Sequence, residues 1–346
     1  MDKCVVELPL RIDLAGGWSD TPPICVENGG CVLNAAVTLE GKRPVKAEVE
    51  RIDAEEVRVI SADLERVGVI RNRKDIYGRQ DPNDWCALVK SALFVSGYEF
   101  SQGGLFIRIS ADVPKGSGMG TSSILGAALV KALLTVKNGR SPDWQTVSEL
   151  TLALEQKMET GGGWQDQMGA LVPGVKLVSS SKGARQKCRV KTLSPSATES
   201  FARFLRERGV LYFTGQKRMA RNVLQGVIRF YKRNPGGVAD KIVKALKKDA
   251  RDGFKALEAK DYPKFVEKVN SYWLNKKALD PGSTNPEVES IIARIAPWTD
   301  AVTLCGAGGG GFMFAVAKSA VAKRNMKRVL ASAGNGGRCY GFALEV

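Results

Sequence analysis

The sequence predicts a mixed α and β protein, and three observations support this fold class. Its 346 residues suggest two domains or one large one. Runs rich in β-branched residues recur through the first 60 positions and indicate strands. Residues 236–277 are rich in Lys, Ala and Leu with helical periodicity. A polar stretch at residues 179–187 indicates a boundary, so we expect domains over residues 1–185 and 186–346.

Runs of apolar and β-branched residues predict the strands. The first covers residues 5–14 and ends at Gly16-Gly17, and the second covers residues 31–39. Residues 45–60 are expected to form a hairpin. Further strands are expected at residues 105–109, 174–178, 188–193, 210–213 and 338–346, and on both sides of a glycine loop within residues 302–317.

Helical periodicity and end signals predict the helices. Asp84 is a candidate cap for a helix over residues 84–96. A helix over residues 122–137 has one apolar face. The next, over residues 144–159, stops at three consecutive glycines. Further helices are expected from about residue 219, through residues 236–277 and over residues 318–333.

The composition excludes several kinds of catalytic and metal site. The chain has no histidine, which rules out Ser-His-Asp and Cys-His catalysis and His-ligated metals. A general base must therefore be a carboxylate, a lysine, a tyrosine or the substrate itself. The seven cysteines form no CxxC pair and follow no signal peptide. They are expected to be free thiols in a reducing compartment, which predicts a cytoplasmic protein.

The formal net charge of +16 is large. It can keep a basic surface soluble, or it can favour a phosphate-bearing ligand. Basic residues are dispersed, and no segment interleaves them with aromatic residues as a single-strand nucleic-acid surface does. No apolar run approaches the roughly 18 residues that span a bilayer. We therefore expect small-molecule partners without nucleic acid or membrane, and the oligomeric state stays open.

The strongest motif is a glycine-rich loop at residues 113–123, between a predicted strand and a predicted helix. Its glycines let the backbone approach a ligand closely, and the helix N-terminus adds unpaired N–H donors and partial positive charge. Three alternating glycines followed by three hydroxyl residues favour a triphosphate site over a purely structural turn. The Walker pattern GxxxxGKS/T is absent. The expected ATP-binding residues are Lys115, Gly116, Ser117, Gly118, Met119, Gly120, Thr121, Ser122 and Ser123.

A second glycine-rich loop, at residues 305–312, satisfies the GxGxxG pattern of dinucleotide-binding folds. The segment after it is predicted to be a strand and not a helix. About twenty residues further on stand Lys327 and Arg328, where the dinucleotide fold needs an acid. We therefore disfavour a dinucleotide site. The alternative is a glycine turn that allows close backbone packing.

Two carboxylates are candidates for proton transfer and metal binding. Asp166 follows the three glycines at residues 161–163, and Glu155 lies eleven residues upstream in a predicted helix. Asp166 could orient or abstract a hydroxyl proton, and Glu155 could hold Mg²⁺. Taken singly, each acid is more typical of a solvated helix or loop. Asp166 is a candidate base only because it occurs together with the other motifs.

Charged residues also occur in the first strand and the loop after it. Arg11 and Asp13 lie on one face of the strand over residues 5–14. Their alternation with apolar residues could equally mark a side that faces solvent. Asp20 stands in the following turn and could be a turn cap. The residues alone leave these alternatives open.

In this order the motifs resemble the GHMP kinase family and, within it, the fucokinases more closely. The sequence motifs GGWSDTPP and GGGWQDQ are specific to that group, whereas the glycine loops alone would indicate only the superfamily. The segments that carry the resemblance span nearly the whole chain. They are RIDLAGGWSDTPP at 11–23, GSGMGTSSIL at 116–125, SPDWQTVSEL at 141–150, GGGWQDQ at 161–167, FTGQKRMARNVL at 213–224, SYWLNKK at 271–277 and GAGGGGF at 306–312.

The resemblance implies the α+β two-domain GHMP kinase fold. Its N-terminal domain is similar to domain 2 of ribosomal protein S5, its C-terminal domain is ferredoxin-like, and the active site lies between them. ATP is bound by the first glycine loop, and Mg²⁺ is held by Ser122 beside Glu155. Asp166 matches the catalytic Asp, and Arg11 matches the arginine that keeps this Asp ionised. The implied sugar-binding residues are Trp18, Asp20, Gly163 and Trp164.

The implied reaction is transfer of the ATP γ-phosphoryl group to the anomeric hydroxyl of L-fucose or a related 6-deoxyhexose. One alternative is a kinase for the anomeric hydroxyl of D-glycero-D-manno-heptose 7-phosphate, with Lys217–Arg221 as the basic cluster to inspect. Another is a non-catalytic relative that binds sugar or RNA. Many fucokinases are fused to a sugar-nucleotide pyrophosphorylase, to which nothing here corresponds. A free-standing kinase and an excised domain both remain open.

Overall fold

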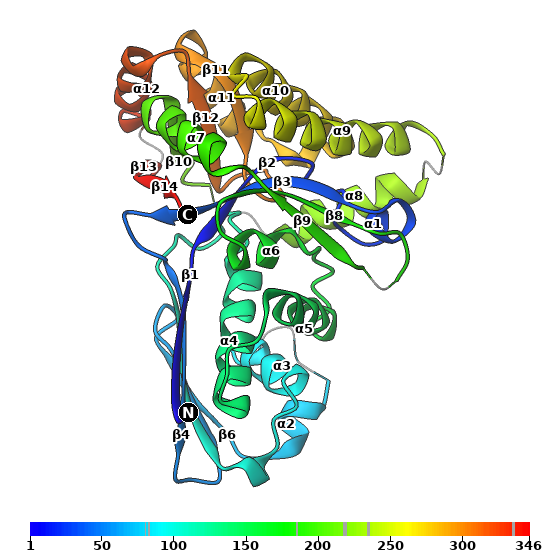
Figure 1. Cartoon of the computed structure of the whole chain (residues 1–346), viewed down its shortest axis with the longest axis vertical. Helices are drawn as coiled ribbons and strands as arrows, with labels where there is room; N and C mark the ends of the chain where they lie inside the picture. The colour runs from blue at the N-terminus through cyan, green and yellow to red at the C-terminus, as the bar shows by residue number, and fades with distance from the viewer. Residues whose placement is uncertain (80, 82–83, 185, 217–219, 234–235, 334–335) are drawn as a thin grey trace. The chain divides into compact units, whose positions relative to one another are not determined.

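The computed structural model describes residues 1–79, 81, 84–184, 186–216, 220–233, 236–333 and 336–346. They form two compact units (Figure 1). Unit 1 comprises Met1–Leu10, Arg43–Val113 and Gly120–Val172, and unit 2 comprises Arg11–Lys42, Pro114–Met119 and Pro173–Val346. The units do not coincide with the expected segments 1–185 and 186–346, because the early residues of unit 2 pair with strands from after residue 173.

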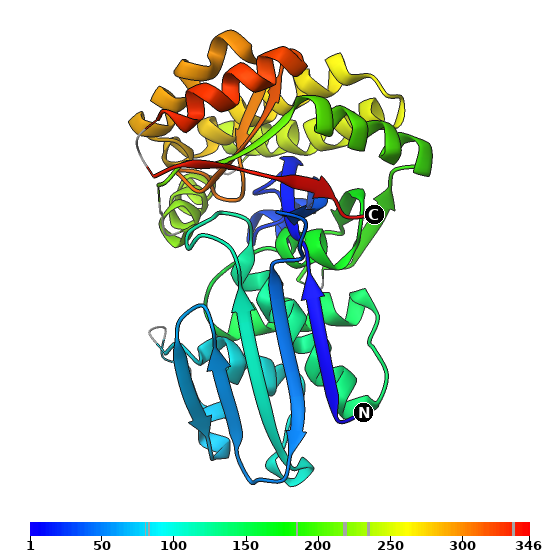
Figure 2. The ribbon, with the colours of Figure 1, turned by 90° about the vertical axis from the view of Figure 1, so that its left-hand side faces the viewer.

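A five-stranded sheet forms one face of unit 1 (Figure 2). Its order is β1 (Lys3–Leu8), β4 (Val45–Ile52), β7 (Gly104–Ala111), β5 (Val57–Ser61) and β6 (Arg66–Ile70). β5 and β7 are parallel, and the other neighbours are antiparallel. The expected hairpin within residues 45–60 is therefore wrong, since β7 lies between β4 and β5. Alternation of apolar residues determines which face of a strand is buried, but not which strand lies beside it.

Five helices accompany this sheet in the described part of unit 1. They are α2 (Arg73–Tyr77), α3 (Ala87–Val95), α4 (Thr121–Asn138), α5 (Trp144–Lys157) and α6 (Gln165–Leu171). α4 packs against β1 and β4 as well as against α3, α5 and α6. Its expected apolar face is buried, and so are Ala127 and Val130 between the positions of that face. The helix that begins at the glycine-rich loop is therefore enclosed along most of its length.

Unit 2 contains two sheets. The first has the antiparallel order β11 (Thr299–Leu304), β12 (Phe312–Ala317), β10 (Gly209–Phe213) and β13 (Arg338–Tyr340). The second has the order β14 (Phe342–Leu344), β3 (Cys31–Leu39), β8 (Val175–Ser180) and β9 (Cys188–Thr192), with β2 (Leu10–Ala15) also paired to β3. The single strand expected at residues 338–346 is two strands in different sheets, which separate at Gly341.

The helices of unit 2 are α1 (Ile24–Asn28), α7 (Pro195–Arg208), α8 (Ala220–Arg233), α9 (Val238–Glu258), α10 (Tyr262–Leu279), α11 (Pro286–Ile295) and α12 (Ala320–Ala331). The helix expected over residues 236–277 is thus two helices. They separate at Lys260, whose φ of 59° lies in the left-handed region. Tyr212, Trp273, Ile295 and Met313 belong to the core that α10, α11 and α12 form with the first sheet.

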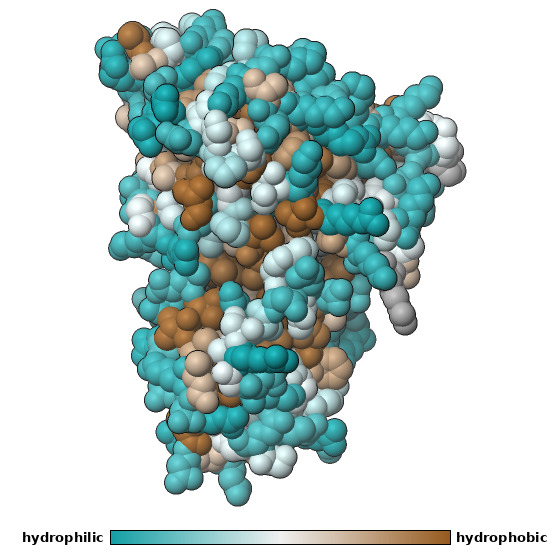
Figure 3. Space-filling model, in the orientation of Figure 1, coloured by the Kyte–Doolittle hydropathy of each residue, from teal (hydrophilic) through white to brown (hydrophobic). Residues whose placement is uncertain are grey.

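Unit 2 carries the positive charge of the chain. Its segments contain 36 Lys and Arg residues against 17 Asp and Glu, whereas those of unit 1 contain 16 against 19. The face of the molecule over α9 and α10 is correspondingly hydrophilic (Figure 3). On α9, burial and the nearby Arg251 lower the pKa of Lys247. None of the helices among the described residues is both long and apolar enough to cross a bilayer.

The start of α10 gives a stability prediction. The Asp261 carboxylate accepts a hydrogen bond from the backbone N–H of Lys264 at 3.0 Å. Asp261→Ala should lower the free energy of unfolding by about 1 kcal/mol, because it removes this cap. Asp261→Asn is the matched control, since asparagine caps equally well, and should change the value by less than about 0.5 kcal/mol. Denaturant titration measures both, and equal losses would contradict the cap.

Candidate active site

The N-cap residue of α4 is Gly120, with φ of 74°, which makes no side-chain capping hydrogen bond. The first intrahelical bond runs from the Ile124 N–H to the Gly120 carbonyl at 3.0 Å. The N–H groups of the first turn and the positive end of the helix dipole form an anion site of the kind that binds phosphate. Ser122 in this turn is exposed.

The Asp166 carboxylate lies directly against this helix end. A Cβ atom on Gly120 would be 2.5 Å from Asp166 Cγ and 2.8 Å from Oδ2, closer than real Cβ contacts. Glycine at position 120 is therefore required sterically as well as for its backbone conformation. We expected Asp166 in a loop beyond a helix end, but it lies in the first turn of α6 and is half-buried. The structure thus joins the predicted base to the predicted phosphate site.

Glu155 is the second carboxylate near this helix end. It is buried near the C-terminus of α5, and it accepts hydrogen bonds from Ser123 Oγ and, at 3.3 Å, from Thr160 Oγ1. A Cβ atom on Gly162 would lie 2.0 Å from Glu155 Oε2. This contact explains one of the three consecutive glycines, because any side chain there would displace the carboxylate.

The predicted magnesium pair was Ser122 with Glu155. In the structure the hydroxyl on Glu155 belongs to Ser123, whereas Ser122 is exposed. Hydroxyl and carboxylate oxygens are the hard donors that Mg²⁺ prefers, so the chemistry of this set fits that ion. Across the described residues no three His, Cys, Asp or Glu side chains gather as a metal cluster. A small donor set suits Mg²⁺, which commonly keeps waters and phosphate oxygens as its other ligands.

In unit 2 the two glycine-rich loops pack main chain against main chain. The Phe312 N–H donates to the Ser117 carbonyl at 2.8 Å. A Cβ atom would lie 2.2 Å from the Gly118 carbonyl oxygen if placed on Gly306, and 2.4 Å from the Ser117 oxygen if placed on Gly311. The second loop leads into strand β12, as expected, and not into a helix. Its glycines therefore allow close backbone packing, the interpretation that the sequence favours over a dinucleotide site.

Arg11 and Asp13 are buried, so the alternative that they face solvent is wrong. Arg11 Nη1 donates to Asp13 Oδ1 and to the Gly118 carbonyl, both at 3.1 Å. Asp13 Oδ1 also accepts from the Gly306 N–H at 2.8 Å. One buried ion pair therefore contacts both glycine-rich loops within unit 2. Arg11 belongs to unit 2 and Asp166 to unit 1, and the predicted action of one on the other stays a prediction.

The predicted sugar-binding residues of unit 2 lie in a fixed loop. Ser19 Oγ donates to the Gly16 carbonyl at 2.6 Å and accepts from the Cys31 N–H at 3.0 Å. Trp18 takes φ of 74°, which is uncommon for a bulky residue, and its buried indole nitrogen has no partner among the described residues. Asp20 is buried, and it precedes Pro23, the N-cap of α1.

The predicted sugar-binding residues of unit 1 flank the start of α6. Trp164 is its N-cap and is buried, and its indole nitrogen finds no partner within the described chain. Gly163 is half-buried. Gln167 was not among the predicted site residues, although it closes the GGGWQDQ segment. It is buried with both amide atoms unpartnered by any described residue. Unpartnered buried polar groups are costly, so the side chains of Trp164 and Gln167 indicate a polar ligand or water.

Other predicted residues contribute less. Lys115 and Gly116 are exposed, and Met119 is buried with its N–H 3.3 Å from Ser117 Oγ. Thr121 is half-buried at the first position of α4. Lys217 and Arg218, of the basic cluster considered for a phosphorylated sugar, lie outside the described residues.

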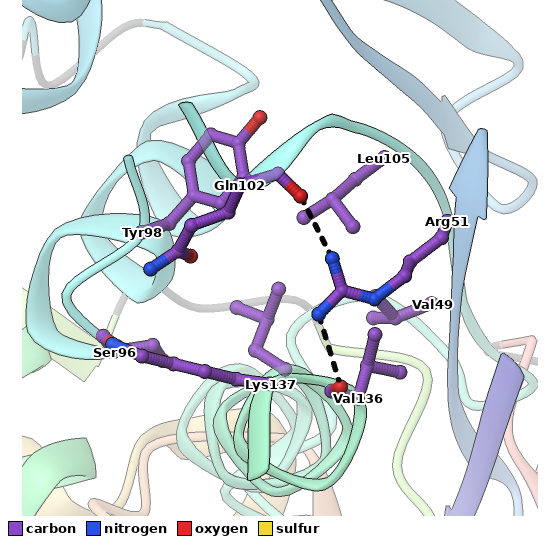
Figure 4. A pocket seen from close by; sticks show the side chains of 9 residues that line it. Val49, Arg51, Ser96, Tyr98, Gln102, Leu105, Val136 and Lys137 are labelled. Carbon is purple, nitrogen blue, oxygen red and sulfur yellow. Dashed lines mark hydrogen bonds between the residues drawn. The ribbon is translucent and has the colours of Figure 1, made fainter. Parts of the chain in front are cut away.

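A pocket in unit 1 lies at the other end of α4 (Figure 4). Arg51 donates to the Gln102 carbonyl at 2.8 Å and to the Val136 carbonyl at 3.4 Å, and Lys137 donates to the Ser96 carbonyl at 2.9 Å. These cations neutralise the carboxyl ends of α4 and α3. The cavity holds about 20 Å³, room for about one water molecule, which excludes a sugar or nucleotide.

Comparison with known proteins identifies two family models in the chain. The model for the GHMP kinases N terminal domain matches residues 87–174, and the model for the GHMP kinases C terminal domain matches residues 254–336. The bifunctional fucokinase/GDP-fucose pyrophosphorylase of Arabidopsis thaliana is 38% identical over 329 residues, which are 94% of this chain and 31% of that protein. The chain thus spans about a third of that relative's length.

Two further similarities concern proteins of comparable length. The D-glycero-alpha-D-manno-heptose 7-phosphate kinase of Campylobacter jejuni is 27% identical over 332 residues, covering 89% of this chain and 87% of that protein. The crystal structure of Lactococcus lactis galactokinase complexed with galactose superposes with a TM-score of 0.75 at 16% identity, over 99% of this chain and 93% of that one. The second likeness concerns the fold alone.

The contact between the two loops gives a prediction about unit 2. Gly311→Ala would place a Cβ atom 2.4 Å from the Ser117 carbonyl oxygen, at φ of 77°. Gly174→Ala is the matched control, because φ there is 73° and nothing lies within 4 Å. The control should lose about 1–2 kcal/mol of unfolding free energy, and Gly311→Ala about 1–3 kcal/mol more. Equal losses in denaturant titration would mean that the loops are not in close contact.

Proposed function

The chain belongs to the GHMP kinase family, and we propose that it transfers the γ-phosphoryl group of ATP to the anomeric hydroxyl of L-fucose or a related 6-deoxyhexose. The observation that carries this proposal is the Asp166 carboxylate, which lies against Gly120, the N-cap residue of α4. A base beside a phosphate-binding helix end is the arrangement that phosphoryl transfer to a hydroxyl needs. The 38% identity to the fucokinase of Arabidopsis thaliana supports the choice of sugar.

The glycine-rich loop is proposed to bind the triphosphate. N–H groups of the first turn of α4 donate to phosphate oxygens, and the helix dipole stabilises their negative charge. Mg²⁺, when bound, neutralises phosphate charge, and Glu155 with Ser123 or Ser122 would hold it. The positions of these groups are fixed by packing, because α4 is buried against β1, β4 and three helices. Little reorganisation is then needed during the reaction.

Asp166 is proposed to orient the anomeric hydroxyl and to accept its proton as the bond to phosphorus forms. A general base of this kind contributes mainly by positioning, because the transition state of phosphoryl transfer is loose. Arg11 is proposed to act at the transferred phosphoryl group, and this role rests on the family resemblance.

The proposed sugar-binding set favours an uncharged sugar. Trp18 and Trp164 each have a buried indole N–H without a partner in the described chain, and Gln167 has a buried amide in the same condition. Together with Asp20 they offer neutral donors and acceptors plus one carboxylate, which suit hydroxyl groups. A phosphorylated heptose would instead need cations; this set contains an acid and no base, and Lys217 and Arg218 lie outside the described residues. The similarity to the heptose-phosphate kinase of Campylobacter jejuni keeps that substrate as the competitor.

The substrate is tested by ADP release with Mg·ATP against a panel of sugars. L-Fucose should be turned over selectively, with D-arabinose weaker because it lacks the methyl group that an apolar pocket would bury. L-Galactose, D-galactose, D-mannose and D-glycero-D-manno-heptose 7-phosphate complete the panel. Turnover of the heptose phosphate alone would overturn the sugar assignment, and no turnover of any sugar would overturn the kinase proposal.

The base is tested by Asp166→Asn, which keeps the shape of the side chain and removes its basicity. We expect kcat to fall about 10²- to 10⁴-fold, the usual contribution of a general base. Asp143→Asn is the matched control in unit 1, because Asp143 caps α5 through the Thr146 N–H and asparagine can keep that bond. A wild-type kcat in Asp166→Asn would show that this carboxylate is not the base.

A further inference from the structure

The segment SYWLNKK at residues 271–277 has no role in the site described so far. It lies in α10, where Tyr272 and Lys276 are four positions apart and so share one face of the helix. Both side chains are completely buried. Tyr272 OH donates to Asp13 Oδ2 at 2.7 Å, and Lys276 Nζ is 3.5 Å from the same oxygen. This face of α10 therefore meets the acid that pairs with Arg11.

Asp13 is surrounded by donors on both carboxylate oxygens. Oδ1 accepts from Arg11 at 3.1 Å and from the Gly306 N–H at 2.8 Å, and Oδ2 contacts the two α10 side chains. Burial and the negative charge of Asp13 raise the pKa of Tyr272, so its hydroxyl remains a donor. Burial lowers the pKa of Lys276, while Asp13 opposes this effect. The arrangement fixes the orientation of the carboxylate.

Lys276 also contacts the second glycine-rich loop. Its Nζ donates to the Leu304 carbonyl at 2.7 Å, at the end of β11. Two residues later, the Gly306 N–H is held by Asp13. Cys305 lies between them, and burial raises the pKa of its thiol to about 12, so the thiol stays protonated. The peptide backbone on both sides of Cys305 is thus held by one side chain of α10 and by the acid that α10 supports.

We propose that Tyr272 and Lys276 are positioning residues for phosphoryl transfer. Through Asp13 they fix the guanidinium group of Arg11 and the peptide groups of Gly118 and Gly306. The catalytic part of this inference rests on the proposed function. Stability alone is a weak reason for such a cluster, since well-packed apolar side chains of similar volume usually stabilise a core as much or more. A role in orienting the guanidinium group of Arg11 explains better why Tyr272 and Lys276 are polar.

The test compares two Tyr→Phe variants on the same helix. Tyr272→Phe removes the hydroxyl on Asp13. Tyr262→Phe is the matched control, because its hydroxyl lies 2.6 Å from Ser200 Oγ, on α7, and not on Asp13. With L-fucose and Mg·ATP, kcat normalised to the folded fraction should fall about 10- to 100-fold in Tyr272→Phe, the value of a hydrogen bond to a charged group. KM for ATP should change less than about threefold, because Arg11 acts on the transition state.

Lys276→Met and Lys277→Met form a second matched pair. Lys277 pairs with Glu289 at 3.3 Å and is only half-buried, so its loss should leave kcat unchanged within about twofold. Lys276→Met should lower kcat by about 10-fold or more, because the Leu304 carbonyl and Asp13 Oδ2 lose their donor. A loss of folded protein without a change in normalised kcat in either Tyr272→Phe or Lys276→Met would reduce the network to a structural role and overturn the inference.

Amide hydrogen exchange gives a measurement that does not depend on turnover. Peptides that cover residues 304–312 and 116–120 should exchange faster in Tyr272→Phe than in Tyr262→Phe, because both loops lose a support. Equal exchange and equal kcat in the two variants would overturn the proposal. Faster exchange together with a wild-type protein that phosphorylates no sugar would instead overturn the proposed function, and it would leave the network as the support of the two loops.

Discussion

The close contact between two glycine-rich loops is the constraint on which the structure of unit 2 around Arg11 depends. Carbonyl oxygens of Ser117 and Gly118 occupy the space where side chains on Gly311 and Gly306 would otherwise lie. Such a contact needs both backbones held in place, because it is made by main-chain atoms at positions where no side chain fits. The support comes from the Arg11–Asp13 ion pair, which bonds to the Gly118 carbonyl and the Gly306 N–H. A buried charge pair thus does what side-chain packing does elsewhere in a core.

Glycines also make close contacts in unit 1, where side-chain carboxylates and not backbone carbonyl oxygens occupy the space beside them. Asp166 occupies the space beside Gly120, and Glu155 occupies the space beside Gly162. Glycine at position 120 lets an acid approach the backbone at the helix end that is proposed to bind phosphate. The acid is then positioned by steric fit and by its own helix. The lack of a side chain at Gly120 and Gly162 therefore leaves space for the two carboxylates, and backbone flexibility is not needed to explain these glycines.

Local features were predictable, and distant pairings were not. The strand over residues 31–39 was predicted with its observed bounds, and α4 within one residue at each end, because periodicity and glycine ends are local signals. The hairpin was wrong, since β7 enters between β4 and β5 from 50 residues away. Residues 236–277 are predicted as one helix, yet the structure has two helices that separate at Lys260. Candidate residues such as Asp166 and Arg11 came from motifs, but Tyr272 reaches Asp13 across 259 positions, beyond any local pattern.

The charge distribution bears on what the basic surface is for. The excess of Lys and Arg belongs to unit 2, whereas unit 1, which holds Asp166 and Glu155, is slightly acidic by count. The proposed sugar-binding residues include one acid and no base. The proposed set itself thus contains no cation for a phosphorylated sugar, while Lys217 and Arg218 lie outside the described residues. A broad positive field instead raises the local concentration of any polyanion, and the polyanion that a kinase must capture in every cycle is the nucleotide. The large net charge is thus compatible with a neutral sugar acceptor.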